Sequence, residues 1–327
     1  MKAIVRQAFG GPEQLHIEEV ATPTPSASEV LIRVKAFGIN RAEQYFRMGT
    51  WGDVHAISGI ECVGEVENDP SGRLTSGQKV LALMGGMGRS IAGSYAEYVT
   101  VSQQNVVPLQ SDLTWADLAA LPESYATAWA CLMDNLKLER GQTVVIRGAT
   151  SALGQAAINI AHHAGIKIIA TARNTDRADY LMSLGVTQVL AEKPDLSEHI
   201  GKLHNAGVYA VLDIIGTATL LDSLKIPMRG GRVCMAGFLG GAEAIEKFNP
   251  LAHLPSGRQL SFFGSAFVFG TAEYPLSDIP FQQIIDCATN GSYQAKPAHV
   301  FQFNEIQAAH RLLDAHQATG KIVVVIE

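Results

Sequence analysis

Short apolar runs bounded by Gly, Pro and Ser occupy the first third of the chain, and this pattern is typical of β-strands. The strand-like runs cover residues 29–36, 59–66, 79–84 and 95–101. Because turn residues and not helical segments separate them, the pattern predicts a mostly antiparallel barrel or sandwich.

The pattern changes near Pro122. Beyond residue 138, apolar runs alternate with segments of helical periodicity, which is typical of a doubly wound parallel sheet. The strand-like runs there cover residues 143–146, 167–171, 188–191, 210–214, 231–236 and 260–264. We expect further helices over about 276–289 and 304–315, and a last strand over 321–326 that returns to the first domain.

The length of 327 residues exceeds the size at which a single hydrophobic core normally stops growing, which favours two domains. The predicted fold class is therefore α/β, with a doubly wound parallel sheet and a mostly antiparallel β-domain. We assign residues 1–122 and 265–327 to the β-domain and residues 123–264 to the parallel-sheet domain.

The most informative motif lies where the strand over 143–146 meets the next helix. Residues 148–154 read Gly-Ala-Thr-Ser-Ala-Leu-Gly, and their small size lets the backbone approach a pyrophosphate at the helix N-terminus. Only the last glycine of the common G-x-G-x-x-G pattern is kept, but the surrounding βαβ unit supports a nucleotide site. The expected contacts come from Ala149, Thr150, Ser151, Ala152 and Leu153.

The end of the second strand of this unit indicates which dinucleotide is bound. An NAD site usually carries Asp or Glu there, to accept hydrogen bonds from the ribose hydroxyls. This chain has Arg173, which can pair with a 2′-phosphate and stack on adenine. Thr171 and Asn174 are candidate further donors to that phosphate. The sequence therefore predicts NADPH as the cofactor.

Charge and composition disfavour several classes of partner. The formal net charge of −6 provides no basic field for nucleic acid, and no apolar run is long enough to span a membrane. The start of the chain lacks the apolar core of a signal peptide, and the 4 cysteines show no C-x-x-C spacing. We expect a cytoplasmic protein without a nucleic-acid or membrane partner.

Several ordered motifs resemble the medium-chain dehydrogenase/reductase superfamily, and the similarity spans essentially the whole chain. The motifs are residues 30–34, 38–43, 59–64, 143–154 and 318–324. Within the superfamily, the chain most resembles the zinc-independent quinone oxidoreductase branch, which includes zeta-crystallin. The resemblance implies a GroES-like barrel combined with a Rossmann domain.

The same resemblance bears on metal binding. Positions that hold the catalytic zinc in alcohol dehydrogenases of the superfamily correspond here to Asn40, Ile60 and Glu123. One carboxylate cannot replace a set of Cys, His and Cys, so we expect no metal.

The resemblance also implies which residues surround the reacting groups. Those expected at the catalytic pocket are Asn40, Tyr45, Trp51 and Tyr125. Those expected at the cofactor, besides the turn and Arg173, are Asn40, Thr127 and Lys321. The strand-end residues Ala236, Gly237 and Phe238 join them, because open parallel sheets bind ligands at that edge. Alternatively, Asn40 only caps a helix and Tyr45 only packs.

Without zinc, the predicted chemistry is transfer of reducing equivalents from NADPH to a quinone, with protein donors stabilising charge on the acceptor oxygen. One alternative is an NADPH-dependent enone or enoyl-thioester reductase. Another is a non-catalytic NADPH-binding or structural, crystallin-like protein. The resemblance implies that the protein forms a homodimer through the apolar strand between Leu260 and Phe269. Alternatively, that strand is covered within one subunit.

Overall fold

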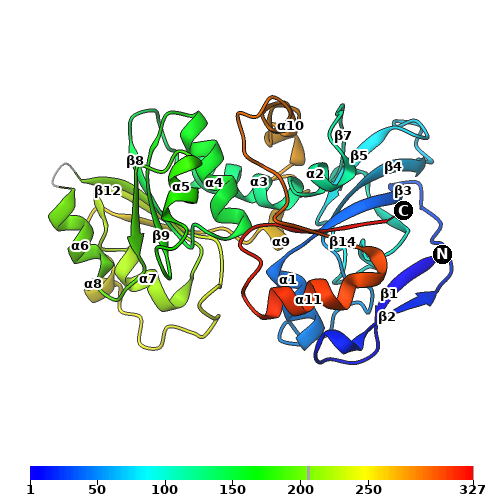
Figure 1. Cartoon of the computed structure of the whole chain (residues 1–327), viewed down its shortest axis with the longest axis horizontal. Helices are drawn as coiled ribbons and strands as arrows, with labels where there is room; N and C mark the ends of the chain where they lie inside the picture. The colour runs from blue at the N-terminus through cyan, green and yellow to red at the C-terminus, as the bar shows by residue number, and fades with distance from the viewer. Residues whose placement is uncertain (205–206, 327) are drawn as a thin grey trace. The chain divides into compact units, whose positions relative to one another are not determined.

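The computed structural model describes residues 1–204 and 207–326, which divide into two units (Figure 1). Unit 1 comprises Met1–Glu123, Ser265–Gly291 and the chain from Ala295 onward. Unit 2 comprises Ser124–Gly264 and Ser292–Gln294. Within the described residues, no helix has both the length and the apolar character needed to cross a bilayer.

Unit 2 is built on a six-stranded sheet with the order β10-β9-β8-β11-β12-β13, in which all neighbouring strands are parallel. The strands are β8 (Thr143–Arg147), β9 (Lys167–Ala172), β10 (Gln188–Ala191), β11 (Val208–Asp213), β12 (Pro227–Met235) and β13 (Gln259–Phe262). The direction of the strand order changes between β8 and β11, where sheets of this kind bind ligands. The predicted doubly wound sheet is confirmed.

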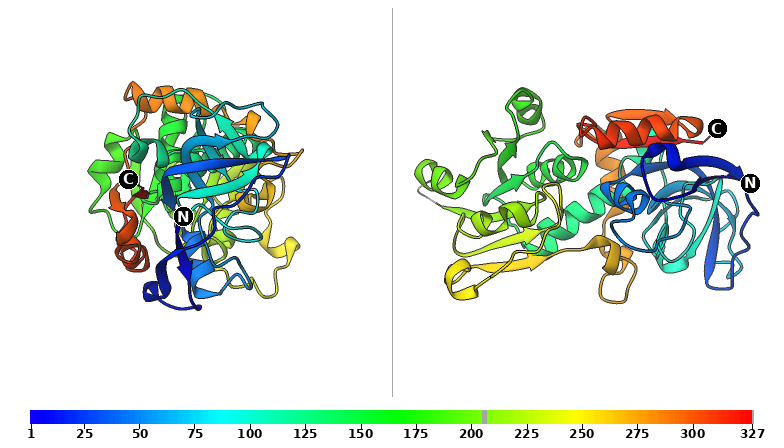
Figure 2. Two further views of the ribbon diagram at one scale, coloured as in Figure 1. Left: turned by 90° about the vertical axis from the view of Figure 1, so that its right-hand side faces the viewer. Right: turned by 90° about the horizontal axis from the view of Figure 1, so that it is seen from below.

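Helices lie on both sides of this sheet (Figure 2). They are α3 (Pro122–Trp129), the π-helix η3 (Ala130–Asn135), α4 (Ala152–His163), α5 (Ala178–Ser183), α6 (Leu196–Leu203), α7 (Thr217–Ser223) and α8 (Pro250–His253). Buried strand residues such as Val145, Val211 and Val233 pack with Ile200 and Leu220 of the helices to form the core.

Unit 1 contains a seven-stranded sheet with the path β14-β15-β3-β4-β5-β7, and β6 pairs with β3. Its strands are β3 (Glu29–Ile39), β4 (Glu61–Asn68), β5 (Lys79–Leu83), β6 (Tyr98–Ser102), β7 (Val106–Pro108), β14 (His299–Gln302) and β15 (Ile322–Val325). A separate antiparallel pair consists of β1 (Lys2–Arg6) and β2 (Leu15–Glu19). Only β14 and β15 are parallel within this sheet, so the domain is mostly antiparallel as predicted.

The helices of unit 1 are short and connect its strands. They are α1 (Arg41–Met48), α2 (Trp115–Ala119), α9 (Ser265–Val268), α10 (Phe281–Thr289) and α11 (Ile306–Asp314). Single 3₁₀ turns are η1 (Pro12–Gln14), η2 (Gln103–Asn105), η4 (Leu276–Asp278) and η5 (Phe303–Glu305). The strand β15 pairs with β3, so the end of the described chain returns to the first domain as expected.

Two predicted elements need correction. The strand expected between Leu260 and Phe269 ends at Phe262, and α9 begins at Ser265. The helix expected from residue 276 begins only at Phe281, because Pro280 lacks an N–H and keeps the preceding residue extended.

A buried carboxylate fixes the start of α1. Glu43 accepts a hydrogen bond from the N–H of Asn40 at 2.8 Å and another from the N–H of Ile60 at 3.0 Å. This one side chain therefore joins the N-terminus of α1 to the residue before β4. Complete burial, with the nearby charge of Glu61 as a further cause, raises the pKa of Glu43 to about 7.

We predict a pH dependence of stability from this group. The pKa of Glu43 in the folded protein lies above its ordinary value of 4.5, so the folded state binds the proton more tightly than the unfolded chain. Its contribution to the free energy of unfolding therefore falls by roughly 3 kcal/mol as the pH rises from about 5 to about 8. Urea denaturation across this range should therefore show the free energy of unfolding of the wild type falling by this amount relative to that of Glu43→Gln, because all other titrating groups are common to both proteins. The same slope in both proteins would contradict the shift.

Candidate functional site

A buried ion pair lies beside Asn40 in unit 1. The Nζ atom of Lys321 donates to Oε1 of Glu61 and to Oδ1 of Asn40, both at 2.5 Å, and Nδ2 of Asn40 donates to the same Glu61 oxygen at 2.8 Å. The side chains of Lys321 and Glu61 are only 4% and 0% exposed. All three residues are therefore held in one closed hydrogen-bonded cluster.

The sheet order explains why these residues meet. Asn40 follows β3, Glu61 begins β4 and Lys321 precedes β15, and β3 lies between β4 and β15. A side chain at position 38 would occupy the same space, because its Cβ would lie 2.4 Å from Cε of Lys321 and 2.5 Å from Oε1 of Glu61. Gly38 thus makes the ion pair sterically possible.

The cluster engages two residues that were expected at the reacting groups. Lys321 was expected at the nicotinamide, and its ammonium donates to Glu61 and Asn40 within unit 1. Its contact with the nicotinamide stays a prediction. The amide of Asn40 does more than a helix cap, since both its oxygen and its nitrogen belong to the ion-pair cluster.

The residues at the expected zinc positions do not fit a zinc ion. The amide oxygen of Asn40 accepts from an ammonium, and Ile60 has no ligand atom. Glu123 alone offers a carboxylate, and its Oε1 accepts from the hydroxyl of Ser265 at 3.3 Å. The fixed charge of Lys321 would also repel a dication. Over residues 1–204 and 207–326, no group of three or more His, Cys, Asp or Glu side chains is arranged to hold a metal ion.

An aromatic row extends from α1 to a pocket in unit 1. The ring of Tyr45 stacks on Trp51 with centroids 6.3 Å apart, and Trp51 stacks on Phe267 at 5.8 Å. Trp51 and Phe267 line a pocket of about 550 Å³. The other lining residues are Thr50, Asp53, Val54, Arg89 and Ser90. The structure thus places Trp51 at a pocket and Tyr45 against Trp51, and the role of this pocket in acceptor binding stays a prediction.

The predicted nucleotide turn in unit 2 has the geometry of a phosphate-binding turn. Gly148 has a φ of +84°, a value that favours glycine. Ser151 caps α4, because its Oγ accepts from the N–H of Gly154 at 3.0 Å and donates to the carbonyl of Gly148 at 2.8 Å. A Cβ on Gly154 would lie 2.6 Å from that carbonyl, so glycine is needed for close packing of helix and strand.

The turn leaves the start of α4 as the natural place for an anion. Ala149 is buried, whereas Thr150, Ala152 and Leu153 are half-buried. The first N–H groups of an α-helix have no partner within the helix, and they suit a pyrophosphate. The residues present therefore fit a dinucleotide, although their contacts with it stay a prediction.

The residues expected at a 2′-phosphate separate into two groups. Arg173 and Asn174 are exposed just beyond the end of β9. Thr171 is fully buried, and its hydroxyl donates to Oε2 of Glu192 at 2.7 Å. Because this hydroxyl has no access to solvent, the expectation that Thr171 contacts the phosphate is wrong.

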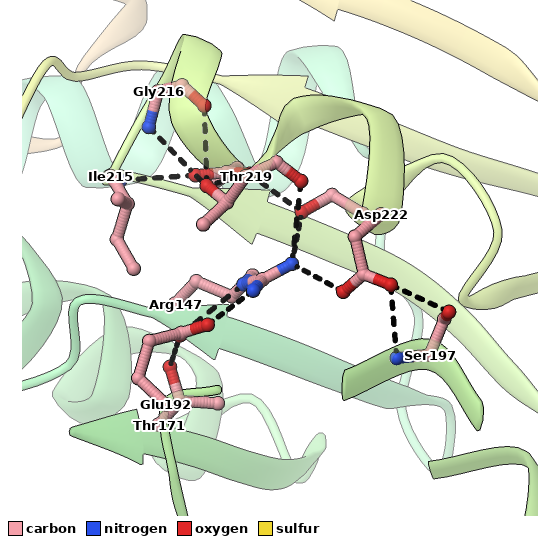
Figure 3. A network of polar contacts seen from close by, with 10 residues as sticks. Arg147, Thr171, Glu192, Ser197, Ile215, Gly216, Thr219 and Asp222 are labelled. Atoms are coloured by element: carbon pink, nitrogen blue, oxygen red, sulfur yellow. Dashed lines mark hydrogen bonds and ion pairs between the residues drawn. The ribbon is translucent and has the colours of Figure 1, made fainter. Parts of the chain in front are cut away.

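Thr171 belongs to a buried network centred on Arg147 (Figure 3). The guanidinium of Arg147 is 1% exposed and donates to Glu192, to Oδ2 of Asp222 at 3.0 Å and to the hydroxyl of Ser223 at 2.9 Å. Asp213, at the end of β11, accepts from the same Ser223 hydroxyl at 2.6 Å. The network joins the ends of β8, β9 and β11 to α7, directly before the turn at Gly148. Sequence analysis missed this network because its members are far apart in the chain.

Tyr125 and Thr127 lie on α3 and are only 3% and 2% exposed. The hydroxyl of Tyr125 accepts from Nδ2 of Asn159 at 2.8 Å, and its ring stacks on Tyr293 with centroids 5.5 Å apart. These contacts engage the hydroxyl and the ring of Tyr125 within unit 2, and they favour a packing role over the expected catalytic role. The expected contact of Thr127 with the cofactor stays a prediction.

The segment after β12 lies at the carboxyl edge of the sheet, where the nicotinamide was expected. Ala236, Gly237 and Phe238 are half-buried there. A Cβ on Gly237 would lie 2.5 Å from the carbonyl oxygen of Ile214, so the backbone after β11 passes close to this segment. The position agrees with the expectation, and contact with a cofactor stays a prediction.

Glu61 and Glu43 are site residues that sequence reasoning did not select. Both carboxylates are 0% exposed, and both hold the backbone or amide of Asn40. The available signal was the single acidic residue within the apolar run Gly59-Ile60-Glu61-Cys62-Val63, since a buried carboxylate needs specific partners.

Comparisons with known proteins cover both units. Residues 26–111 match the family described as "Alcohol dehydrogenase GroES-like domain", and residues 152–283 match the "Zinc-binding dehydrogenase" family. A quinone oxidoreductase of Rattus norvegicus is 29% identical over 74% of this chain and 75% of its own length.

Solved structures show the same fold over the whole chain. The Escherichia coli quinone oxidoreductase complexed with NADPH has a TM-score of 0.86 at 20% identity and covers 99% of this chain and 100% of its own. The CurK enoyl reductase has a TM-score of 0.83 at 24% identity, and the match covers 100% of this chain and 99% of the CurK chain. With its two matched domain families in this order, the chain belongs to the medium-chain dehydrogenase/reductase superfamily.

Proposed function

We propose that this protein is a zinc-independent, NADPH-dependent oxidoreductase that transfers reducing equivalents to a quinone. The observation that carries the proposal is the Lys321–Glu61–Asn40 cluster, because it engages the amide of Asn40, one of the three positions that the resemblance aligns with zinc ligands. A dehydrogenase fold without a Lewis acid needs an acceptor that is already electron-poor. Quinones meet this requirement, and the relationship to quinone oxidoreductases supports the choice.

Unit 2 supplies the proposed cofactor site. NADPH, when bound, supplies the reducing equivalents. The N-terminus of α4 binds the pyrophosphate, and the exposed guanidinium of Arg173 binds the 2′-phosphate together with Asn174. The backbone at 236–238 orients the nicotinamide. The Escherichia coli protein of the same fold, solved with NADPH, supports this cofactor.

Unit 1 supplies the proposed acceptor site. The quinone ring packs against Trp51 and Phe267 in the 550 Å³ pocket. Tyr45 and Asn40 stabilise the negative charge that develops on the acceptor oxygen by hydrogen bonding. The Lys321–Glu61 pair orients Asn40, and its ammonium polarises the amide through Oδ1.

The cellular setting and assembly are also proposed. All four cysteines are free and buried, which suits the reducing cytoplasm. The edge strand β13 exposes Leu260 and Phe262 by 39% and 51%, which favours a homodimer through this edge.

The function is tested by NADPH oxidation with matched acceptors, namely a naphthoquinone and an α,β-unsaturated ketone. The proposal expects turnover of the quinone at a higher kcat/KM than the ketone. A higher kcat/KM for the ketone would identify an enone reductase. NADPH binding without turnover of any acceptor would identify the non-catalytic alternative.

One prediction tests the proposed contact between Arg173 and the 2′-phosphate of NADPH. Arg173→Ala should raise the Kd for NADPH about ten- to a hundredfold, equivalent to about 1.5–3 kcal/mol, because a charge-assisted contact is lost. The Kd for NADH should change little. Fluorescence titration measures both, and Arg177→Ala, which removes an arginine stacked on Tyr180 at 4.4 Å, serves as the control. Equal losses for NADPH and NADH would refute the assignment of Arg173.

The second prediction concerns the acceptor oxygen. Tyr45→Phe keeps the ring stacked on Trp51 and removes only the hydroxyl, so kcat/KM for the quinone should fall about tenfold or more. The Kd for NADPH should stay unchanged. Tyr125→Phe is the matched control, because that hydroxyl contacts Asn159 and should affect stability more than turnover. Wild-type turnover by Tyr45→Phe with every acceptor would show that Tyr45 only packs.

A further inference from the structure

We propose that Arg89 makes the unit 1 pocket selective for planar acceptors that carry an acidic substituent, such as a sulfonated or carboxylated quinone. The inference rests on the proposed function, since it assumes that this pocket takes the acceptor. It goes further by assigning a substrate class and a specificity-determining residue.

The position of Arg89 is fixed by contacts that leave its charge unneutralised. Its Nη2 donates to the carbonyl of Ala266 at 2.5 Å, and its Cζ lies 5.3 Å from the centroid of the Phe267 ring. Among the described residues, no carboxylate forms an ion pair with it, and a guanidinium has five N–H donors. Donors therefore remain for a ligand in the pocket that Arg89 lines.

Partial burial of Arg89 strengthens its attraction to an anionic ligand. Burial lowers the pKa of Arg89, yet a guanidinium stays charged at neutral pH. A cation that has lost part of its hydration gains more from an anion than a fully solvated one. The geometry therefore favours a ligand anion at this position.

The same wall of the pocket offers a surface for a flat ring. Trp51 and Phe267 have ring planes inclined by only 26°, and Arg89 lies over the Phe267 ring. A planar acceptor that packs against Trp51 and Phe267 in the pocket can thus present an acidic group to Arg89. Arginine suits this task because its planar donors match the oxygen geometry of carboxylates and sulfonates.

The other charged lining residue opposes the anion. Asp53 is exposed. Burial lowers the pKa of Arg6, and the negative charge of Asp53 partly offsets this by raising it. Asp53 and Arg89 therefore have opposite expected effects on an acidic acceptor. This gives the test a variant with the opposite sign.

The experiment compares 1,2-naphthoquinone with 1,2-naphthoquinone-4-sulfonate at saturating NADPH. The two acceptors differ in reactivity, so the readout is the change in their kcat/KM ratio between variants. Arg89→Gln should lower the ratio of kcat/KM for the sulfonate to kcat/KM for the neutral quinone tenfold or more. Arg89→Lys should keep part of the preference, and Asp53→Asn should raise it a few-fold.

The outcomes separate this inference from the proposed function. If both quinones are reduced and the ratio is the same in the wild type, Arg89→Gln and Asp53→Asn, the inference is overturned and the proposed function stands. If the wild type reduces neither quinone, the proposed function fails. Calorimetric binding of naphthalene-2-sulfonate then decides the pocket's preference: the inference expects binding that Arg89→Gln weakens about tenfold, and equal binding by both proteins refutes it. Arg89→Lys and Asp53→Asn keep both tests valid if Arg89→Gln does not fold.

Discussion

The buried ion pair between Lys321 and Glu61 is the interaction on which the proposed chemistry in unit 1 depends. Burying two charges is costly unless every donor and acceptor is satisfied. Here Glu61 accepts from Lys321, from the amide of Asn40 and, through Oε2, from the N–H of Glu123 at 2.8 Å. The pair therefore fixes the orientation of Asn40 and the start of α1, which carries Tyr45. A glycine at position 38 is the steric condition for all of these contacts.

A second buried charge organises unit 2 in a comparable way. Arg147 joins the carboxyl ends of three strands to α7, and the nucleotide turn begins at the next residue. In both units, a buried charged group holds the ends of strands together: the Lys321–Glu61 pair in unit 1 and Arg147 in unit 2. Functional residues commonly lie at such strand ends. Ser151, at a glycine position of the common fingerprint, adds a helix cap to the turn. The altered motif therefore remains compatible with a dinucleotide.

The fold was predictable because local and long-range preferences agree along most of the chain. The short apolar runs of unit 1 and the alternating strand-like and helix-like segments of unit 2 are patterns of residues close in sequence, and they predict the fold class. The failures arise from contacts distant in sequence. Thr171 was expected at the 2′-phosphate, but Glu192 engages its buried hydroxyl. Tyr125 was expected at the catalytic pocket, and its hydroxyl contacts Asn159. Glu61 resembles a solvent-facing strand residue until Lys321, 260 positions away, is brought beside it.

The central claim is that this chain moves reducing equivalents from NADPH to a quinone without a metal. The most direct test is NADPH oxidation by naphthoquinone after exhaustive chelation, followed at 340 nm with the metal content of the same sample determined by mass spectrometry. The account predicts an unchanged rate at a substoichiometric metal content, because the amide of Asn40 and the apolar side chain of Ile60 stand at two of the three expected zinc-ligand positions. Activity that is lost on chelation and restored by stoichiometric zinc would contradict it.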